Sequence, residues 1–527
     1  MRYCSIEDFL RQQGICDTDE DYNDVINRAS TQIAKVEKDH FGTLDDSCVI
    51  QFNDYCKKRM LCLGSPILMS IGRKERKSLA SCAAMQLPEH YSGNILKMIE
   101  EYYLNNMGIG FNLSPFCDPV GVLRELNKHA DEVAAKNSNI RFIGNMAILD
   151  YDHPDIFSFI TCKQQYVLPH FNLSVNLSER FFQLHESGQP ITFRLKRYST
   201  IEFIETIADS IYCSAEPGMV FLDRINQNNI VPSLGKYFAT APCAEIGMVD
   251  GDLCMFGYIN ISSFYDPASK RFDCRELRNA VRVITQILDD CIELQLDSSF
   301  QYNAVIRQKR RIAIGVCGFA DLLDMLQIPY GSDQSIKLLQ DILLLINYCS
   351  KLHSSKLAEA RGSFEAFPQS EYRNKHYLET KFGNISSSTI STKDWTILDE
   401  QINKHGIRNS STTAIPPSGR TSYLLEASPS IEPHFSNAVS YRQTYSHTVI
   451  GGGLTATEIS AVDHLRVLDA ATQCIDEGVS KTINLREDCT REQITKILLS
   501  AIEFKNITGI AIYRDRSLSS QPFALNS

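Results

Sequence analysis

Strand-like and helix-like segments alternate along most of this chain, and this alternation limits the folds open to it. Residues 170–177 alternate apolar and polar side chains, the period of a strand with one buried face. Residues 510–513 form a short apolar run, as expected of a strand covered on both sides, although the run alone also fits a buried helical turn. Apolar stripes at helical spacing over 277–291 and 339–349 predict two amphipathic helices, the second ending at Gly362. The order predicts an α/β fold with a mainly parallel sheet or barrel.

Composition and charge exclude several classes of protein. The chain has 527 residues, of which 43% are hydrophobic and 22% charged, so collagen, coiled-coil and largely disordered folds are excluded. The formal net charge of −10 argues against nucleic acid as a partner. No apolar run approaches the roughly 18 residues of a membrane helix, and the first residues form no secretory signal. We therefore expect a cytoplasmic protein that needs no membrane partner.

The cysteines do not form a recognisable metal or redox motif. The chain has 17 of them, scattered without any C-x-x-C pair, so neither a zinc knuckle nor a thioredoxin-type motif is present and no metal site is expected. In a reducing compartment most of these cysteines are small packing residues. The three glycines at 451–453 are interpreted as a loop.

One segment nevertheless combines a thiol with a carboxylate. Cys243 and Glu245 lie two residues apart, so an extended chain puts both on one face. A sulfur can exchange a hydrogen with a substrate while a carboxylate takes a proton from a neighbouring hydroxyl. The alternative is a buried cysteine beside a surface glutamate. The turn signal Asp250-Gly251 predicts a hairpin in which Cys254 faces Gly247, so this hairpin does not bring Cys254 to Cys243 and a second thiol from elsewhere is needed for a redox pair.

A series of short motifs then follows in order along the chain: Ser65-Pro66, Leu79 to Cys82, Gly108 to Ser114, Asn145-Met146, His153 to Ile156, Phe171 to Val175, Pro242 to Glu245, Cys254, Ile259-Asn260, Arg310 to Ile312, Gly318 to Asp321, His405 to Ser410, Pro417 to Gly419, Ile431 to Pro433, Ser480 to Asn484 and Tyr513 to Asp515. Over residues 65–515 this series resembles the large catalytic subunit of ribonucleotide reductases. It is most similar to the class II, adenosylcobalamin-dependent branch.

The resemblance implies an architecture. It implies a ten-stranded α/β barrel with a central finger loop, formed by residues 76–527. A small helical N-terminal region of residues 1–75 precedes it. The segment Ile512-Tyr513-Arg514 has one tyrosine where class I subunits have two adjacent tyrosines, so adenosylcobalamin is the expected cofactor.

The resemblance also implies a chemistry. Cys243 would carry the thiyl radical that abstracts the 3′ hydrogen of a nucleotide ribose, and Glu245 would be the base for the 3′ hydroxyl. Cys82 and Cys254, on neighbouring strands, would supply electrons and a proton as the 2′ hydroxyl leaves as water. They would end as a disulfide, so the implied reaction is reduction of the 2′ carbon of a ribonucleotide.

Substrate binding is implied at a second set of residues. They are Ser81 and Ala241 beside the catalytic cysteines, and the turn formed by Pro417, Ser418, Gly419, Arg420, Thr421 and Ser422. Backbone amides and hydroxyls of such a turn can hold a phosphate. The structural alternative is a plain Pro-Gly turn.

The chain departs from the family pattern at several of these positions. Ala241 replaces an asparagine and Ala244 a glycine of the family signature, and Ser430 replaces another glycine. The loop that follows Ser114 is shortened, and residues 137–144 replace a stretch rich in glycine and arginine. These changes leave two alternatives open: a radical enzyme of the same superfamily acting on another nucleotide-like or sugar-like metabolite, and a catalytically silent nucleotide-binding homologue.

The partners follow from the same comparison with the family pattern. No cysteine follows Cys489, where many family members carry a mobile dithiol, so we expect an external thiol reductant such as a thioredoxin-like protein. A homodimer is left open.

Overall fold

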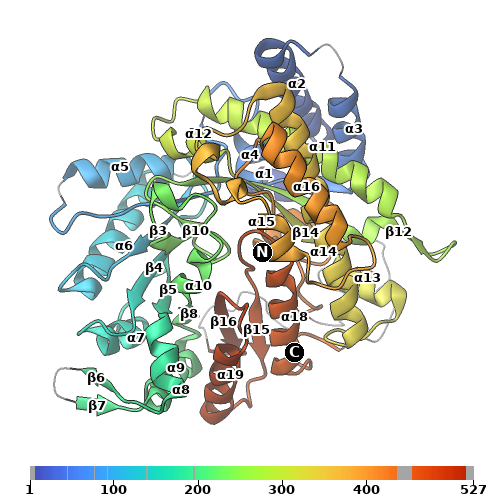
Figure 1. Ribbon diagram of the computed structural model, residues 1–527. Coiled ribbons are helices and arrows are strands. Elements are labelled where there is room, and N and C mark those ends of the chain that lie inside the picture. The colour runs from blue at the N-terminus through green and yellow to red at the C-terminus, as the bar shows by residue number, and fades with distance from the viewer. Residues whose placement is uncertain are drawn as a thin grey trace.

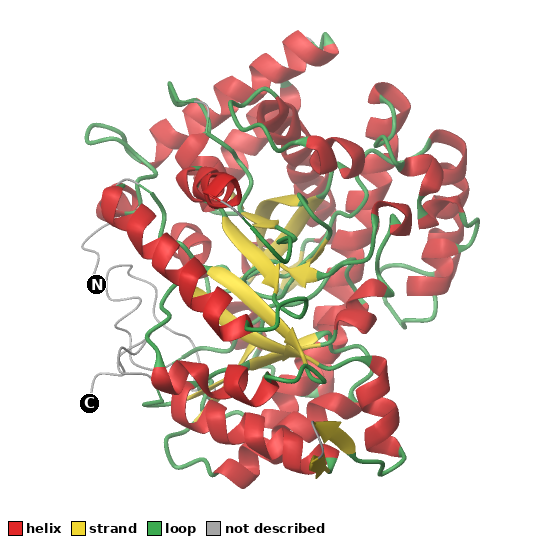
Figure 2. Cartoon of the chain, turned by 90° about the vertical axis from the view of Figure 1, so that its left-hand side faces the viewer, coloured by secondary structure: helices red, strands yellow, loops and turns green. Residues whose placement is uncertain are grey.

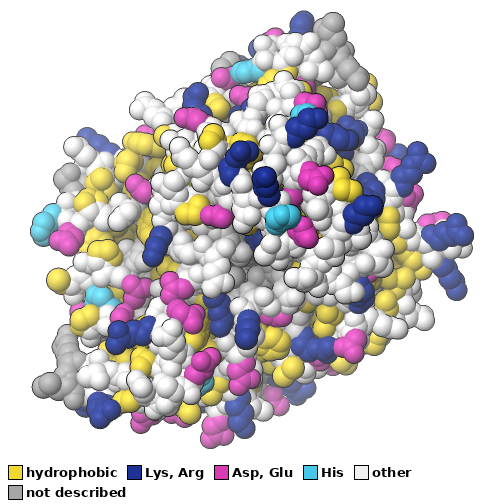
Figure 3. Space-filling view, in the orientation of Figure 1, with side chains coloured by type: hydrophobic (Ala, Val, Ile, Leu, Met, Phe, Trp, Pro, Cys, Tyr) yellow, Lys and Arg dark blue, Asp and Glu magenta, His cyan; other side chains and the backbone are white. Residues whose placement is uncertain are grey.

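The computed structural model describes residues 6–43, 46–75, 77–91, 93–137, 140–193, 196–435 and 454–517. Helices surround a central sheet, as Figures 1 and 2 show. Acidic and basic side chains are interspersed over the face shown in Figure 3. No helix within the described ranges combines the length and apolar character needed to cross a membrane. The predicted loop at 451–453 lies outside these ranges.

The large sheet has ten strands: β1 (Leu61–Leu63), β2 (Cys82–Ala84), β3 (Gly108–Asn112), β4 (Asn145–Asp150), β5 (Phe171–Asn176), β8 (Gly218–Val220), β11 (Leu253–Asn260), β14 (Ile312–Cys317), β15 (Thr482–Leu485) and β16 (Gly509–Arg514). Three two-stranded sheets accompany it: β6 (Ile191–Phe193) with β7 (Lys196–Tyr198), β9 (Ala239–Thr240) with β10 (Gly247–Met248), and β12 (Tyr265–Asp266) with β13 (Arg271–Phe272).

The described helices are α1 (Ile6–Gln12), α2 (Tyr22–Phe41), α3 (Ser47–Lys57), α4 (Ser65–Ser70), α5 (Gly93–Leu104), α6 (Pro119–Lys136), α7 (Ile156–Gln165), α8 (Glu179–Glu186), α9 (Thr200–Ser214), α10 (Leu222–Asn226), α11 (Cys274–Leu296), α12 (Ala304–Lys309), α13 (Phe319–Leu326), α14 (Asp333–Arg361), α15 (Tyr377–Phe382), α16 (Thr392–His405), α17 (Gly419–Leu425), α18 (Ala461–Gln473) and α19 (Arg491–Glu503). Short 3₁₀ turns lie at Pro232–Leu234, Ile261–Phe264, Phe367–Gln369 and Glu371–Arg373.

The sheet contains three groups of parallel strands that meet in antiparallel pairs. Strands β2, β3, β4, β5 and β8 run parallel to one another. At one end β2 pairs antiparallel with β11, which β14 extends in parallel. At the other end β8 pairs antiparallel with β16, which β15 extends in parallel. The segment 412–415 bonds both to β14 and to residues 478–480 just before β15, so backbone hydrogen bonds link the two outer strands. The predicted α/β fold with ten strands is confirmed.

The two predicted helices are confirmed, while the predicted burial of two strands is wrong. α11 and α14 bury their apolar stripes, and α14 ends at Gly362 with a φ of 82°. β5 is buried at Ser174 and Asn176 as well, because it lies mid-sheet between β4 and β8 and packs on both faces. β16 instead exposes Ala511, so it is not covered on both sides. In the N-terminal region, helices α1–α4 accompany β1, which pairs with β11. The division of the chain at residue 75 stays a prediction.

Candidate active site

A short hairpin carries Cys243 and Glu245 at its tip. Strands β9 and β10 pair antiparallel, and the Ala241 amide donates to the carbonyl of Ile246 at 2.8 Å. The Ala244 amide donates back to the Ala241 carbonyl at 2.9 Å, which closes a tight turn. Ala244 has a φ of 64°, a left-handed conformation that costs an L-residue on the order of 1 kcal/mol. This geometry explains why a glycine suits the position in the family signature.

The predicted hairpin between β10 and β11 is wrong. Asp250-Gly251 does form a turn, since the Asp252 amide donates to the Val249 carbonyl at 3.1 Å. However, β10 pairs with β9, and β11 pairs with β2, β1 and β14. Long-range strand pairing satisfies the backbone of β11, so the local turn does not decide its partner. Cys254 therefore does not face Gly247.

Cys254 instead lies directly opposite Cys82. The two residues are register partners on the antiparallel strands β11 and β2. Both thiols are buried and free. Opposed residues in an antiparallel pair have Cα atoms about 4.5–5.5 Å apart, which lies within the roughly 4.4–6.8 Å that a disulfide spans. The pair is therefore placed to change between dithiol and disulfide with little movement of the backbone.

The hairpin is seated against β3 because two glycines leave room for it. A Cβ atom on Gly110 would lie 1.9 Å from the backbone oxygen of Thr240, and one on Gly108 would lie 2.8 Å from the Pro242 ring. The Asn172 side chain on β5 donates to the Pro242 carbonyl at 3.0 Å. The hairpin tip that carries Cys243 is thus held by backbone contacts from β3 and by a side chain of β5.

Replacing Gly110 with alanine is expected to displace this hairpin. The clash involves a backbone oxygen that cannot rotate away, and overpacking of this kind typically costs about 1–3 kcal/mol. We expect a lower melting temperature and faster alkylation of Cys243 by iodoacetamide. Gly144→Ala is the matched control, because a Cβ there meets nothing within 4 Å. Equal effects of the two substitutions on Cys243 would contradict this view of the packing.

Burial and mutual repulsion raise the pKa values of the acidic groups of the site. Burial raises the pKa of Glu245 to about 7, while Arg141 and backbone N–H groups act in the opposite direction. Burial, and then the charge of Glu245, raises the pKa of the Cys243 thiol. Burial raises the pKa of the Cys82 thiol too, with further contributions from Glu245 and Cys243, so these groups lie close enough to interact. Burial likewise raises the pKa of Cys254. Such cysteines are thiols at neutral pH, which disfavours thiolate nucleophilic chemistry and suits transfer of a hydrogen atom.

Polar atoms beside the cysteines lack partners within the described part of the chain. Glu245 Oε2 and Ser81 Oγ are both buried without a hydrogen bond there. A buried polar atom without a partner costs roughly 1–3 kcal/mol, so these atoms indicate where a polar ligand binds. Ala241 is fully buried and offers only a methyl group.

The predicted phosphate turn precedes and begins α17. Its exposed members are Pro417 and Gly419, while Thr421 and Ser422 are buried. Tyr258, on the same strand as Cys254, donates to the Pro417 carbonyl at 3.3 Å and has a pKa that burial raises, with smaller contributions from neighbours that include Glu245. This hydrogen bond connects the turn to the strand that carries Cys254.

Ser418 in the turn and Ser430 beyond it stabilise the local backbone. The Ser418 hydroxyl accepts from the Ser430 amide at 2.7 Å, which occupies one of its lone pairs. Ser430 has a φ of 49°, which explains why a glycine suits that position. Arg420 is partly exposed beside them.

Several residues of the site have no signal in the sequence. Asn172 lies within one of the motifs given above and Tyr258 lies just before another, but nothing in those motifs indicates that these two residues contact the hairpin or the turn. The Gly478 amide donates to the Glu245 carbonyl at 2.8 Å through its backbone alone. Arg141 belongs to a stretch that differs from the family pattern. Only the fold brings these segments to the hairpin.

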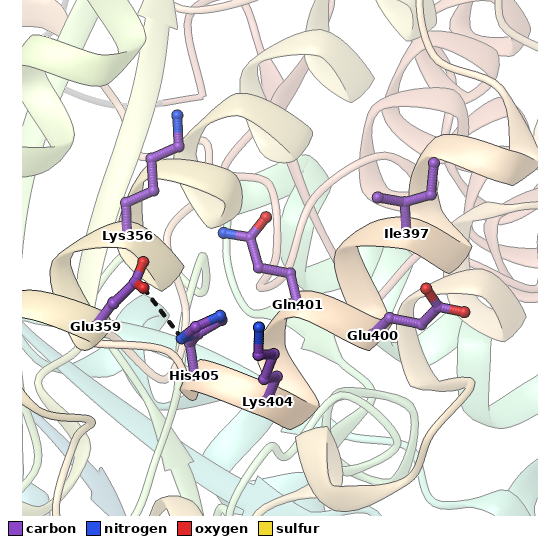
Figure 4. Close-up of a pocket in the computed structure, with 7 residues that line it drawn as sticks. All are labelled: Lys356, Glu359, Ile397, Glu400, Gln401, Lys404 and His405. Carbon is purple, nitrogen blue, oxygen red and sulfur yellow. Dashed lines mark ion pairs between the residues drawn. The ribbon is translucent and has the colours of Figure 1, made fainter.

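A surface groove lies elsewhere. Its volume is 460 Å³, and side chains of α14 and α16 line it: Lys356, Glu359, Ile397, Glu400, Gln401, Lys404 and His405. Figure 4 shows the ion pair between Glu359 and His405, whose atoms are 3.4 Å apart. None of the lining residues belongs to the hairpin, the cysteine pair or the turn.

Comparison with known families gives one match that covers most of the chain. The family described as "Ribonucleotide reductase, barrel domain" matches residues 116–197 and 192–451. These two segments include the hairpin, Cys254 and the turn at 417–422, while Cys82 lies before them.

Named relatives are similar over up to 91% of this chain. A vitamin B12-dependent ribonucleoside-diphosphate reductase of Thermoplasma acidophilum is 29% identical over 91% of this chain and 67% of its own length. One of Mycobacterium tuberculosis is 30% identical over 71% of this chain and 57% of its own length. A vitamin B12-dependent ribonucleotide reductase of Streptomyces clavuligerus is 21% identical over 87% of this chain and 59% of its own length. The chain thus spans between 57% and 67% of the length of these relatives.

Proposed function

This chain belongs to the ribonucleotide reductase barrel-domain family, and we propose that it reduces the 2′ carbon of a ribonucleotide with oxidation of a cysteine pair. The main support for this proposal is that Cys82 and Cys254 are directly opposite each other on paired antiparallel strands. The hairpin with Cys243 and Glu245 lies close enough to affect the pKa of Cys82.

The chemistry follows from the roles of four side chains. Cys243, as a thiyl radical, removes the 3′ hydrogen of the ribose, and Glu245 accepts the proton of the 3′ hydroxyl. The 2′ hydroxyl leaves as water with a proton from the Cys82–Cys254 dithiol. The two thiols lose two electrons and two protons in all and form one S–S bond. One dithiol proton leaves in the water and the other enters the new C–H bond at the 2′ carbon, while Glu245 returns its proton to the 3′ oxygen. The 3′ hydrogen returns from Cys243, so the sulfur radical is regenerated and the net change is one C–O bond replaced by one C–H bond.

Adenosylcobalamin is the proposed cofactor. The three relatives described above are named vitamin B12-dependent, and residues 512–514 contain one tyrosine only. When bound, this cofactor supplies the one-electron oxidant for Cys243. The raised pKa of Cys243 suits that role, because a protonated thiol has a hydrogen atom to give. Cys243 is partly exposed, whereas Cys82 and Cys254 are buried.

The substrate is proposed to lie between the cysteine cluster and the turn at 417–422. Ser81 Oγ and Glu245 Oε2 would bond the ribose hydroxyls, since both atoms lack partners in the described residues. The methyl group of Ala241 would contact the sugar without a hydrogen bond. Pro417, Ser418, Gly419, Arg420, Thr421 and Ser422 would surround the phosphates, with backbone amides and hydroxyls as donors.

Two partners complete the proposal. The disulfide formed in each turnover must be reduced again, so an external thiol reductant such as a thioredoxin-like protein is proposed. A homodimer is proposed as the assembly.

The rate should depend on pH through Glu245. Only the ionised carboxylate accepts a proton, and its pKa is about 7, so kcat/KM should rise about tenfold per pH unit up to pH 7 and then level off. Glu245→Gln is expected to lower kcat by a factor on the order of 10²–10⁴ and to abolish this pH dependence. The measurement is product formation from pH 5.5 to 8.5. The same rise with pH in both proteins would exclude Glu245 as the base.

A nucleotide panel tests the function itself. The purified protein is mixed with adenosylcobalamin, a dithiol and each ribonucleoside di- or triphosphate, and deoxynucleotide is measured by chromatography. We expect product from at least one nucleotide, with a coupled cobalt and thiyl signal by freeze-quench electron paramagnetic resonance. A signal without deoxy product would favour a radical enzyme of another substrate. No signal in wild type or Cys243→Ala would favour a silent nucleotide-binding homologue.

A further inference from the structure

One fully buried guanidinium contacts both arms of the hairpin. Arg311 precedes β14 and is completely buried. Its Nη1 donates to the Gly247 carbonyl on β10 at 2.8 Å, and its Nη2 donates to the Tyr237 hydroxyl at 2.8 Å, two residues before β9 begins. The planar fork of arginine therefore bonds one strand of the hairpin and the segment that leads into the other.

The same guanidinium contacts the segments on either side of the hairpin. Its Nη2 lies 3.2 Å from Asp252 Oδ2, and Asp252 is two residues before Cys254. Its Nε lies 3.4 Å from Glu477 Oε1. The residue after Glu477 is Gly478, whose amide holds the Glu245 carbonyl. Arg311 is thus shared by the segments that carry Cys243, Glu245 and Cys254.

The charges around Arg311 balance inside the protein. Lys309 Nζ pairs with Asp252 Oδ2 at 2.7 Å, and Ser411 donates to Glu477 Oε1 at 2.7 Å. Two cations therefore face two anions, all of them buried. Buried ion pairs contribute little net stability, and in some proteins they serve to fix one arrangement of the chain. An arrangement that needs fixing here is the hairpin against β11.

We propose that Arg311 is a positioning residue that holds the Cys243 hairpin in register with the strand of Cys254. The catalytic importance of this positioning rests on the proposed function. In each turnover the Cys82–Cys254 pair changes its covalent state while the hairpin has to keep its place. A rigid fork that bonds the hairpin and Asp252 together keeps Cys243 at a constant distance from that pair.

Lys309 provides a matched control. It is as buried as Arg311 and pairs with the same carboxylate, and its ammonium lies 4.8 Å from the centre of the Tyr237 ring. Among the described residues, its side chain has neither a hydrogen bond nor an ion pair with Gly247 or Glu477. Lys309→Met therefore removes a buried cation from the cluster without removing the hydrogen bond to the hairpin strand.

The test measures the reactivity of individual cysteines and needs neither nucleotide nor cofactor. Wild type, Arg311→Met, Arg311→Lys and Lys309→Met are treated with iodoacetamide, and peptide mass spectrometry gives the alkylation rate of each cysteine. We expect the rate of Cys243 to rise at least tenfold in Arg311→Met, with Cys82 and Cys254 unchanged, and to stay within twofold in Lys309→Met. Arg311→Lys keeps the charge but not the fork, so a rise of at least threefold is expected.

Two results would overturn the proposal. One is a Cys243 rate within twofold of wild type in Arg311→Lys, a result that decides the question even where Arg311→Met does not fold. The other is an equal rise at all three cysteines in the arginine and lysine variants, which indicates general loosening. Because no turnover is measured, absence of nucleotide reduction would count against the proposed function and leave this inference standing.

Discussion

Replacing Cys243 with alanine should lower deoxynucleotide formation by at least about four orders of magnitude, the scale on which loss of a group that reacts covalently acts. The sulfur is the atom proposed to remove the 3′ hydrogen. Within the described residues, the other cysteines of the cluster are buried in the sheet on β2 and β11, whereas Cys243 is partly exposed at the hairpin tip. Product is measured by chromatography over a time long enough to detect one turnover in a thousand chains.

The control for this substitution is Cys213→Ala. Cys213 is exposed on α9, outside the hairpin and the cysteine pair. We expect its replacement to leave the rate within twofold. If Cys243→Ala kept several per cent of the wild-type rate, another atom would have to start the reaction, and the role proposed for the hairpin would be wrong.

Replacing Cys254 with serine should limit the protein to less than one product per chain, even with excess dithiol. Serine keeps the size of the side chain, but its oxygen cannot form a disulfide with Cys82. The radical on Cys243 should still form, since the hairpin is unchanged. Cys82→Ser should behave in the same way, because the two residues are register partners. The measurement is the number of deoxynucleotides per chain at the end of the reaction.

Cys117→Ser is the control for that experiment, as Cys117 is exposed before α6 and lies outside the site. It should support many turnovers. Multiple turnovers by Cys254→Ser would remove the dithiol role from this pair.

Parts of this structure follow from local sequence patterns. The stripes in α11 and α14 predict both helices, because each helix buries one face against the core. The spacing of Cys243 and Glu245 predicts an extended segment with both groups on one face, and the extended conformation is wrong, because residues 241–244 form a tight turn. In the structure they share the hairpin tip, and Ala244 between them adopts the left-handed conformation of the turn. Patterns of this kind depend on neighbours in the chain, so the sequence contains them directly.

Other parts depend on long-range pairing and cannot be derived locally. Cys82 and Cys254 are opposite each other although 171 residues separate them in the chain, and the local turn at Asp250-Gly251 indicates a different partner. Only the resemblance to a family supplied this pairing. The contacts of the Arg311 guanidinium cannot be derived locally either, because its partners Gly247, Asp252 and Glu477 are distant from Arg311 in the sequence. A single sequence gives no signal for contacts that exist only after the sheet has formed.

The central claim is that the Cys82–Cys254 pair supplies the electrons for the reduction, and a single turnover tests it most directly. Reduced protein, freed of external thiols, is mixed with adenosylcobalamin and a nucleotide substrate, quenched in acid, alkylated and analysed by peptide mass spectrometry. The account predicts one Cys82–Cys254 disulfide for each deoxynucleotide formed, with Cys243 recovered as the alkylated thiol. Deoxynucleotide formed while Cys82 and Cys254 both remain alkylated would contradict it.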